Sequence, residues 1–203
     1  MILAVDTSLG TAVALIEADG AVQALAESPN ALGHAEVIGT LLEQVVGADA
    51  ITHVVAGMGP GPFTGLRIGI ATARAFAVGR GLPVVAVPSH FGAALAIIQN
   101  EAPETRFAIV TDARRREVAI SIFDGLDADG IPNLVERTVL VPRSESEEKL
   151  AGIHAIEVAT LDGAALARVG ARAVAAGRQL ADAEPLYLRQ PDVTVPGAPK
   201  RVS

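Results

Sequence analysis

The first residues able to do chemistry are Asp6, Thr7 and Ser8, which follow the short apolar run 2–5, with Thr11 a little further on. A carboxylate and hydroxyls at a strand end can orient a metal-bound water or contact a phosphate, so Asp6 would act as a base only beside such a ligand. The same residue types favour Asx and Ser/Thr turns. The segment is interpreted as either a phosphate cleft or a turn.

A Gly- and Pro-rich loop at 57–65 joins a predicted strand to a predicted helix, where backbone amides can hold a phosphate. Leu66 and Arg67 follow its last glycine, whereas a P-loop needs Lys and then Ser or Thr. Pro60 and Pro62 also lack amide donors. A stiff turn that lets the helix start close to the sheet is the favoured interpretation.

Histidines show no metal-binding pattern. His34 opens a helix, but a helix-borne metal pair needs a second His four residues on, where the chain has Ile38. His53, His90 and His154 occur singly, without ligand spacing. We expect no intrinsic metal site, and no residue is assigned a catalytic role.

Three adjacent arginines, 114–116, follow Asp112 in the second half of the chain. A solvated turn is one interpretation of this cluster, and contact with RNA phosphates is the other.

Two helices have unusual faces. The helix predicted at 64–79 carries small residues four positions apart, which form a ridge that another helix can approach closely: Gly65, Gly69, Ala73 and Ala77. The ridge packs either on the helix predicted at 34–46 or, jointly with that helix, on another chain. The predicted partner-facing residues are His34, Val37, Ile38, Leu41, Leu42, Val45, Ile70 and the ridge, with Arg67 and Arg74 at the rim.

The composition of the 203 residues excludes several classes of protein. Half are hydrophobic, which excludes a disordered chain, and the net charge is −7. The aromatic share of 3% leaves few stacking platforms for single-stranded nucleic acid, and the absence of Cys excludes disulfides and thiolate sites. No leader and no run long enough to span a membrane is found, so a cytoplasmic location is expected.

The predicted elements position these residues in a duplicated architecture. Strands are expected at 2–5, 11–16, 22–26, 51–56 and 83–87, and helices at 34–46, 64–79 and 89–99. The order βββαβαβα restarts at residue 107, and the second copy is about one unit shorter. We predict two subdomains, 1–100 and 101–190, followed by a flexible Pro-containing tail at 191–203. By analogy, this is the α/β architecture of the actin class (ASKHA, ribonuclease H-like).

Several segments together resemble the bacterial TsaB (YeaZ) family: ILAVDTS, HAE, GMGPGPFTGLRIGIATARAFA, VVAVPS, DARRREV and PLYLR. The resemblance extends from Met1 to about Arg189. It implies an actin-like fold and a role in making N6-threonylcarbamoyladenosine in tRNA. Pro62 departs from the family, which usually has Ser there, and weakens any phosphate role of the loop.

The resemblance also implies a division of labour. The catalytic paralogue, TsaD, binds metal through two His on a helix, and Ile38 replaces the second of them here. The chain is therefore expected to be a non-catalytic scaffold that pairs with TsaD through its two helices, joins the ATPase TsaE and tRNA within the complex, and forms homodimers when alone. No intrinsic cofactor is expected; ATP is used by the complex, and a nucleotide is a candidate ligand at the partner interface.

Asp6, Thr7, Ser8 and Asp112 would then line a vestigial nucleotide cleft. The principal alternative is an enzyme with its own activity, either an actin-like ATPase or phosphotransferase that uses Asp6, or an M22-type peptidase homologue. A third interpretation is a plain homodimeric binding module.

Overall fold

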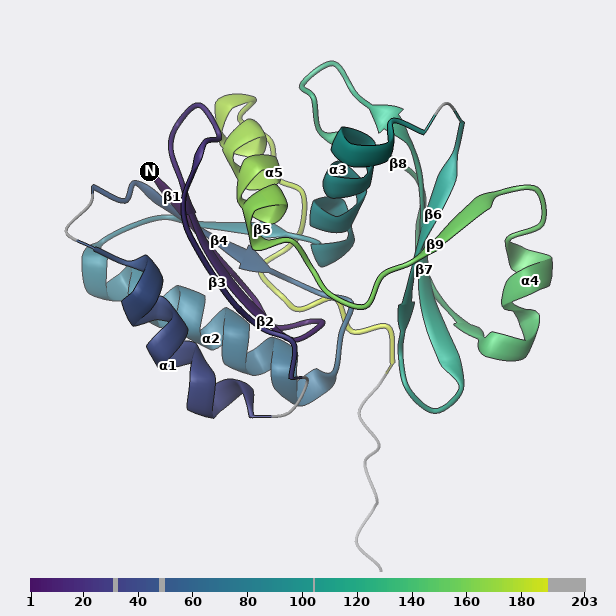
Figure 1. Ribbon diagram of the computed structural model, residues 1–203, viewed down its shortest axis with the longest axis horizontal. Coiled ribbons are helices and arrows are strands. Elements are labelled where there is room, and N and C mark those ends of the chain that lie inside the picture. Colours follow the sequence, from purple (N-terminus) through teal and green to yellow (C-terminus); the bar gives the residue numbers. More distant parts are fainter. Residues whose placement is uncertain (31–32, 48–49, 104, 190–203) are drawn as a thin grey trace, which may run out of the picture.

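A computed structural model describes residues 1–30, 33–47, 50–103 and 105–189. The predicted tail at 191–203 lies outside these residues. The described chain forms two lobes, each built on one β-sheet (Figure 1).

The first lobe contains a five-stranded sheet in the order β3-β2-β1-β4-β5. Its strands are β1 (Ile2–Asp6), β2 (Thr11–Ile16), β3 (Val22–Ser28), β4 (His53–Gly57) and β5 (Val84–Val87). β1 pairs antiparallel with β2 and parallel with β4, and all its residues are buried. A central strand covered on both faces needs a continuous apolar run, which explains why the sequence alternates so little before Asp6.

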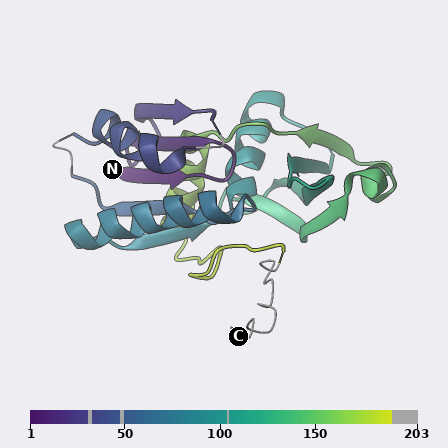
Figure 2. The ribbon, with the colours of Figure 1, turned by 90° about the horizontal axis from the view of Figure 1, so that it is seen from below.

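Helices cover both faces of this sheet. α1 (His34–Val45) and α2 (Phe63–Arg80) lie on one face, and α5 (Gly163–Ala175) lies on the other (Figures 1 and 2). The side chains of β1 alternate between the two layers: Leu3 and Val5 join the cluster under α1 and α2, whereas Ile2 and Ala4 join the cluster under α5.

The second lobe contains a four-stranded sheet in the order β8-β7-β6-β9. Its strands are β6 (Phe107–Asp112), β7 (Glu117–Leu126), β8 (Pro132–Pro142) and β9 (His154–Glu157). The two antiparallel pairings and the parallel fourth strand repeat those of β1 to β4. No described strand corresponds to β5, so the predicted duplication with a shorter second copy is confirmed.

The remaining elements join or flank the lobes. α3 (Ser89–Glu101) links β5 to β6, and a 3-10 turn, Arg143–Glu145, followed by the short α4 (Ser146–Lys149) lies between β8 and β9. Within the described residues, none of the helices combines the length and the apolar character that a membrane span needs.

α3 and α5 pack closely between the lobes. A Cβ atom at Gly92 of α3 would lie 3.1 Å from the backbone of Leu166 in α5, so the small residue permits this approach. α5 falls in the range predicted for the second subdomain, yet Gly170 of this helix lies against Val55 of the first sheet. The chain therefore returns to the first lobe after completing the second sheet.

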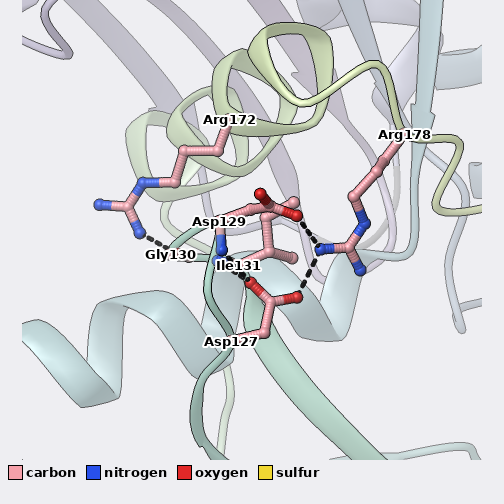
Figure 3. Close-up of polar contacts among 6 residues, drawn as sticks. All are labelled: Asp127, Asp129, Gly130, Ile131, Arg172 and Arg178. Atoms are coloured by element: carbon pink, nitrogen blue, oxygen red, sulfur yellow. Dashed lines mark hydrogen bonds and ion pairs between the residues drawn. The ribbon is translucent and has the colours of Figure 1, made fainter.

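The β7–β8 loop of the second lobe docks on the end of α5 (Figure 3). Arg178 Nη1 lies 2.5 Å from Asp127 Oδ2 and 2.7 Å from Asp129 Oδ2. Asp127 Oδ1 accepts the backbone N–H groups of Asp129 and Ile131, each at 3.0 Å. Burial acts to raise the pKa of Asp127, but the hydrogen bonds from Arg178 and the two amides outweigh it and lower that pKa.

Arg172 completes this brace between the lobes, because its guanidinium donates to the carbonyl of Gly130 (Figure 3). Gly130 has a φ of 72° and sits against the Arg172 side chain, so the tight turn is also the docking point.

Two glycines of α2 provide a test of its position. A Cβ at Gly69 would lie 2.2 Å from Thr7 Oγ1, whereas a Cβ at Gly79 meets no atom within 4 Å. We expect Gly69→Ala to lower the free energy of unfolding by about 1–3 kcal/mol, because Thr7 must move from a packed position. Gly79→Ala should raise it by about 0.5–1 kcal/mol, because alanine reduces the entropy of the unfolded chain. Urea denaturation measures both, and equal stability of Gly69→Ala and wild type would contradict the described packing of α2 on β1.

Candidate functional site

Asp6 lies at the end of β1 and is almost completely buried, with 2% of its surface exposed. Its Oδ1 accepts the backbone N–H of Ser8 at 2.7 Å and the Ser8 hydroxyl at 2.5 Å, and its Oδ2 accepts the Ser89 hydroxyl at 2.5 Å. Burial raises the pKa of Asp6, and the hydrogen bonds from Ser8 and Ser89 partly offset this effect. Oδ1 thus fixes the β1–β2 turn through Ser8, and Oδ2 joins β1 to the start of α3 through Ser89.

The loop after β4 covers this carboxyl. A Cβ at Gly57 would lie 1.7 Å from Asp6 Oδ2, and one at Gly61 would lie 2.7 Å from Ser8 Cα. Ser89 Oγ accepts the N–H of Gly59, which precedes a cis peptide bond to Pro60. The backbone of the loop therefore packs directly on Asp6 and Ser8 and leaves no room for side chains at Gly57 and Gly61. This packing explains the glycines of the loop better than phosphate binding does.

An interlobe cleft of about 870 Å³ lies beyond this loop. One wall is formed by the first turns of α1 and α2, the opposite wall by the β6–β7 turn, and one side by the C-terminal residues 186–189. Its charged lining residues are Glu36, Asp112, Arg114, Arg115 and Arg189.

The predicted nucleotide cleft needs correction at this point. Asp6, Thr7 and Ser8 are buried beneath the glycine loop, and the Thr7 hydroxyl donates to the carbonyl of Gly65 at 2.7 Å. Asp112 lines the interlobe cleft from the second lobe and pairs with Arg143 at 3.2 Å. The structure does not bring the four residues together into one site.

His34 begins α1 at the rim of the interlobe cleft and is 5% exposed. Its Nδ1 lies 2.8 Å from Thr11 Oγ1. Ile38, one turn later, is 7% exposed and packs in the apolar cluster beneath α1. Among the residues that the structure describes, no group of three His, Cys, Asp or Glu side chains is placed to hold a metal ion.

The small-residue ridge of α2 faces inward, in line with the alternative that it packs within this chain and against the alternative that it faces another chain. Gly65, Gly69, Ala73 and Ala77 are all buried, and Gly65 and Gly69 lie against Thr7 at the end of β1. Four further residues of the predicted interface are also buried in the fold: His34, Ile38, Leu41 and Val45 of α1. Ile70 of α2 is buried too, whereas Val37 and Leu42 are half-buried.

The ridge is internal because only small side chains allow α2 to approach β1 this closely. We call the small or apolar exposed residues of α1 and α2 the outer helix face: Ala35, Gly39, Ala71, Ala75 and Val78. Val78 is 81% exposed. Longer exposed side chains lie on the same two helices, including Glu36, Glu43 and Gln44 of α1 and Arg80 of α2.

Arg67 and Arg74 bind the chain's own C-terminal segment. Arg67 Nε donates to the Tyr187 hydroxyl at 2.9 Å, and its guanidinium lies 3.7 Å from the centre of the Phe63 ring. Arg74 donates to the carbonyl of Ala183. The two arginines predicted at the rim of a partner contact therefore hold the C-terminal segment of the same chain.

We call residues 181–189 the C-terminal strap. The N–H of Leu186 donates to the carbonyl of Met58 at 2.8 Å in the first lobe, and Arg189 forms an ion pair with Glu117 in the second. Figure 2 shows the strap, in yellow, running from the first lobe toward the second. The sequence reasoning did not find it, although the chain's one tyrosine, close to the end, was a usable signal.

A buried polar network lies behind the interlobe cleft, and the sequence did not indicate which residues His90 contacts in it. His90 of α3 is 1% exposed, with Nδ1 2.7 Å from Ser121 Oγ and Nε2 3.0 Å from Thr111 Oγ1. Ser121 in turn lies 2.8 Å from Thr138 Oγ1. Burial lowers the pKa of His90 to about 3, so the imidazole is neutral and ties α3 to the second sheet.

Part of the sequence matches a known protein family and several mycobacterial proteins. Residues 31–132 match the sequence model of TsaD, tRNA N6-adenosine threonylcarbamoyltransferase. An uncharacterized protein of Mycobacterium tuberculosis is 38% identical over 124 residues, which are 58% of this chain and 56% of that protein. One of Mycobacterium leprae is 51% identical over 65 residues, 32% of this chain and 16% of that protein. The match thus spans about half the length of the first relative and less of the second.

Solved structures resemble the chain over most of its length. YeaZ from Pseudomonas aeruginosa superposes with a TM-score of 0.73 at 23% identity, covering 92% of this chain and 99% of that one. A second structure, described as similar to peptidase YeaZ from the same organism, gives 0.76 at 23% identity and covers 93% and 99%. The predicted actin-like α/β fold is confirmed.

The His90 network predicts a specific dependence of stability on pH. The folded pKa of about 3 lies below the unfolded value of 6.5, so His90 contributes stability above pH 6.5 that is lost as pH falls toward 3. We expect wild type to lose about 2 kcal/mol more unfolding free energy between pH 7 and pH 5 than His90→Gln does.

Urea denaturation of both proteins at the two pH values measures this difference. NMR titration of the imidazole signals checks the same point without a variant, because His90 should remain neutral to about pH 4. Protonation of His90 near pH 6 would contradict the buried network.

Proposed function

This chain belongs to the family of the tRNA N6-adenosine threonylcarbamoyltransferase TsaD, and from that premise we propose that it is a non-catalytic partner of the catalytic transferase paralogue. The observation that carries the proposal is that α1 has only one of the two histidines expected of a metal-binding helix. In the resemblance described above, the transferase binds metal through two His on this helix. Here His34 bonds to Thr11, and the second position is Ile38 in an apolar core.

We propose that the outer helix face docks on the corresponding helix pair of the transferase, and that it joins two copies of this chain when the transferase is absent. Small exposed residues such as Ala71 and Ala75 permit close contact between helices. Val78 is 81% exposed, and docking would remove its apolar side chain from water, which favours association.

The proposal also assigns places to the other components of the complex. The ATPase TsaE and tRNA would join through the complex in the cytoplasm, and ATP would be consumed there. The interlobe cleft, with Arg114 and Arg115 in its lining, is the place for a nucleotide at the partner interface.

Enzymatic activity through Asp6 is the weaker alternative. A general base must reach a proton of its substrate, whereas both Asp6 oxygens accept hydrogen bonds beneath the glycine loop. Steady ATP hydrolysis by the isolated chain that disappears in Asp6→Ala, in a variant shown to be folded, would favour the enzyme over the scaffold.

Substitution on the outer helix face tests the proposed docking. Ala71→Glu places a charge where two helices would meet, and burying it unpaired should raise the Kd for the transferase at least about 30-fold. Ala175→Glu is the matched control, because Ala175 is an exposed alanine on α5, on the opposite face of the sheet. Isothermal titration with the purified transferase measures both, and equal affinities would contradict the proposed surface.

Reconstitution tests the function itself. Threonylcarbamoyl transfer to tRNA by the transferase, the ATPase and the enzyme that forms the threonylcarbamoyl donor should depend strongly on this chain. The chain alone should form no product. Full transfer without the chain would overturn the scaffold role.

A further inference from the structure

The turn between β6 and β7 holds Arg114, Arg115 and Arg116 in the left-handed region, with φ values of 61°, 53° and 62°. This conformation brings the side chain close to the backbone and is unfavourable for residues other than glycine. Among the described residues, glycine occupies nine other positions with positive φ. At this turn the chain instead keeps three arginines, all of them exposed.

The carboxylates around the turn already have arginine partners from elsewhere in the chain. Arg143 lies 3.2 Å from Asp112 and 3.0 Å from Glu157, and Arg189 forms an ion pair with Glu117. These contacts neutralise the acidic residues that bracket the turn. They leave a local excess of positive charge in a chain whose net charge is −7.

Within the described part of the chain, the guanidinium groups of Arg114 and Arg116 form no ion pair. The backbone of the turn is nevertheless fixed, because the carbonyl of Arg116 accepts the N–H of Arg143 at 2.8 Å and the N–H of Glu117 donates to the carbonyl of Arg114 at 3.0 Å. The turn is therefore rigid, and the guanidinium groups of Arg114 and Arg116 are available to a ligand outside the chain.

The geometry selects among anions. Side chains on a helical turn point in different directions, so Arg114 and Arg116 reach separate phosphates more readily than they converge on one. Arg114 lines the interlobe cleft, whereas Arg116 does not. A ligand that contacts both must extend from the cleft along the outside of the lobe, as a chain of phosphodiesters does.

We propose that the 114–116 turn binds the sugar-phosphate backbone of tRNA directly. The inference rests on the proposed function for the identity of the RNA, and on Arg114 and Arg116, which form no ion pair among the described residues, for the contact itself. Guanidinium groups bind phosphate oxygens through paired hydrogen bonds, and the contact carries no sequence information. The turn would position the tRNA while other subunits select the base.

Binding of a fluorescently labelled tRNA transcript tests this contact, measured by anisotropy at about 50 mM salt and upward. The Arg114→Glu, Arg116→Glu double variant should bind at least about tenfold more weakly and should reduce the slope of log K against log salt by about two. Arg80→Glu, at the far end of α2 from the cleft, is the matched control and should change neither quantity. Equal binding of wild type and the double variant would overturn the proposal.

Arg116→Gly separates the charge from the backbone, because Arg116 has a φ of 62°. Glycine adopts positive φ without strain, so this variant should melt at a higher temperature than wild type while binding tRNA more weakly. A variant that is more stable and binds equally well would contradict the contact of Arg116 with RNA. Binding of wild type to anionic phospholipid vesicles but not to tRNA would also overturn the proposal.

The titrations are made with the isolated chain and with its complex with the transferase. A double variant that still forms this complex, binds tRNA as wild type does and supports full transfer would overturn the RNA contact and leave the proposed function intact. If no complex forms with wild type, the proposed function fails, and the titration of the isolated chain still decides the RNA contact.

Discussion

The buried Asp6 carboxyl is the constraint on which the rest of the first lobe depends. It lies at the end of the central strand and accepts hydrogen bonds from Ser8 and Ser89, so it fixes the β1–β2 turn and the start of α3 together. Because an unsatisfied buried carboxyl is costly, these partners must be kept. The loop after β4 then has room only for backbone, and Gly57 and Gly61 follow from that restriction. An acidic residue that would contact a ligand in a catalytic cleft is here part of the framework.

The same close packing decides which side of α2 another protein can reach. Thr7, the neighbour of Asp6, fills the space beside Gly65 and Gly69, so the small-residue side of the helix is committed to the sheet. The outer side carries Ala71, Ala75 and Val78, which are small or apolar without being needed by the chain's own core. The strap binds Arg67 and Arg74 at the margin of this side. A partner would therefore meet a surface bounded on one side by the chain's own C-terminal segment.

Much of this architecture could be predicted from the sequence because local patterns report it directly. The apolar run before Asp6 predicted the first strand, and the element order that restarts at residue 107 predicted the second sheet. The direction of the α2 ridge could not be predicted, since four-residue spacing of small side chains shows that something comes close but not what. Contacts between distant segments were equally hidden. Neither Arg67 with Tyr187 nor His90 with Ser121 leaves a periodic signal, although a hydroxyl among inward-facing apolar residues of β7 was a hint.

Three separate contacts hold the lobes at one angle and thereby define the interlobe cleft. α3 packs on α5 through Gly92, the β7–β8 loop docks on Arg172 and Arg178, and the strap reaches the second lobe through Arg189. Actin-like proteins that open and close around a nucleotide need a contact that can be released, whereas these contacts brace the lobes on several sides. With the lobes braced, the arginine turn has a fixed position relative to the outer helix face. That arrangement suits a subunit whose contribution is to hold two larger partners, a protein and an RNA, in one relative orientation.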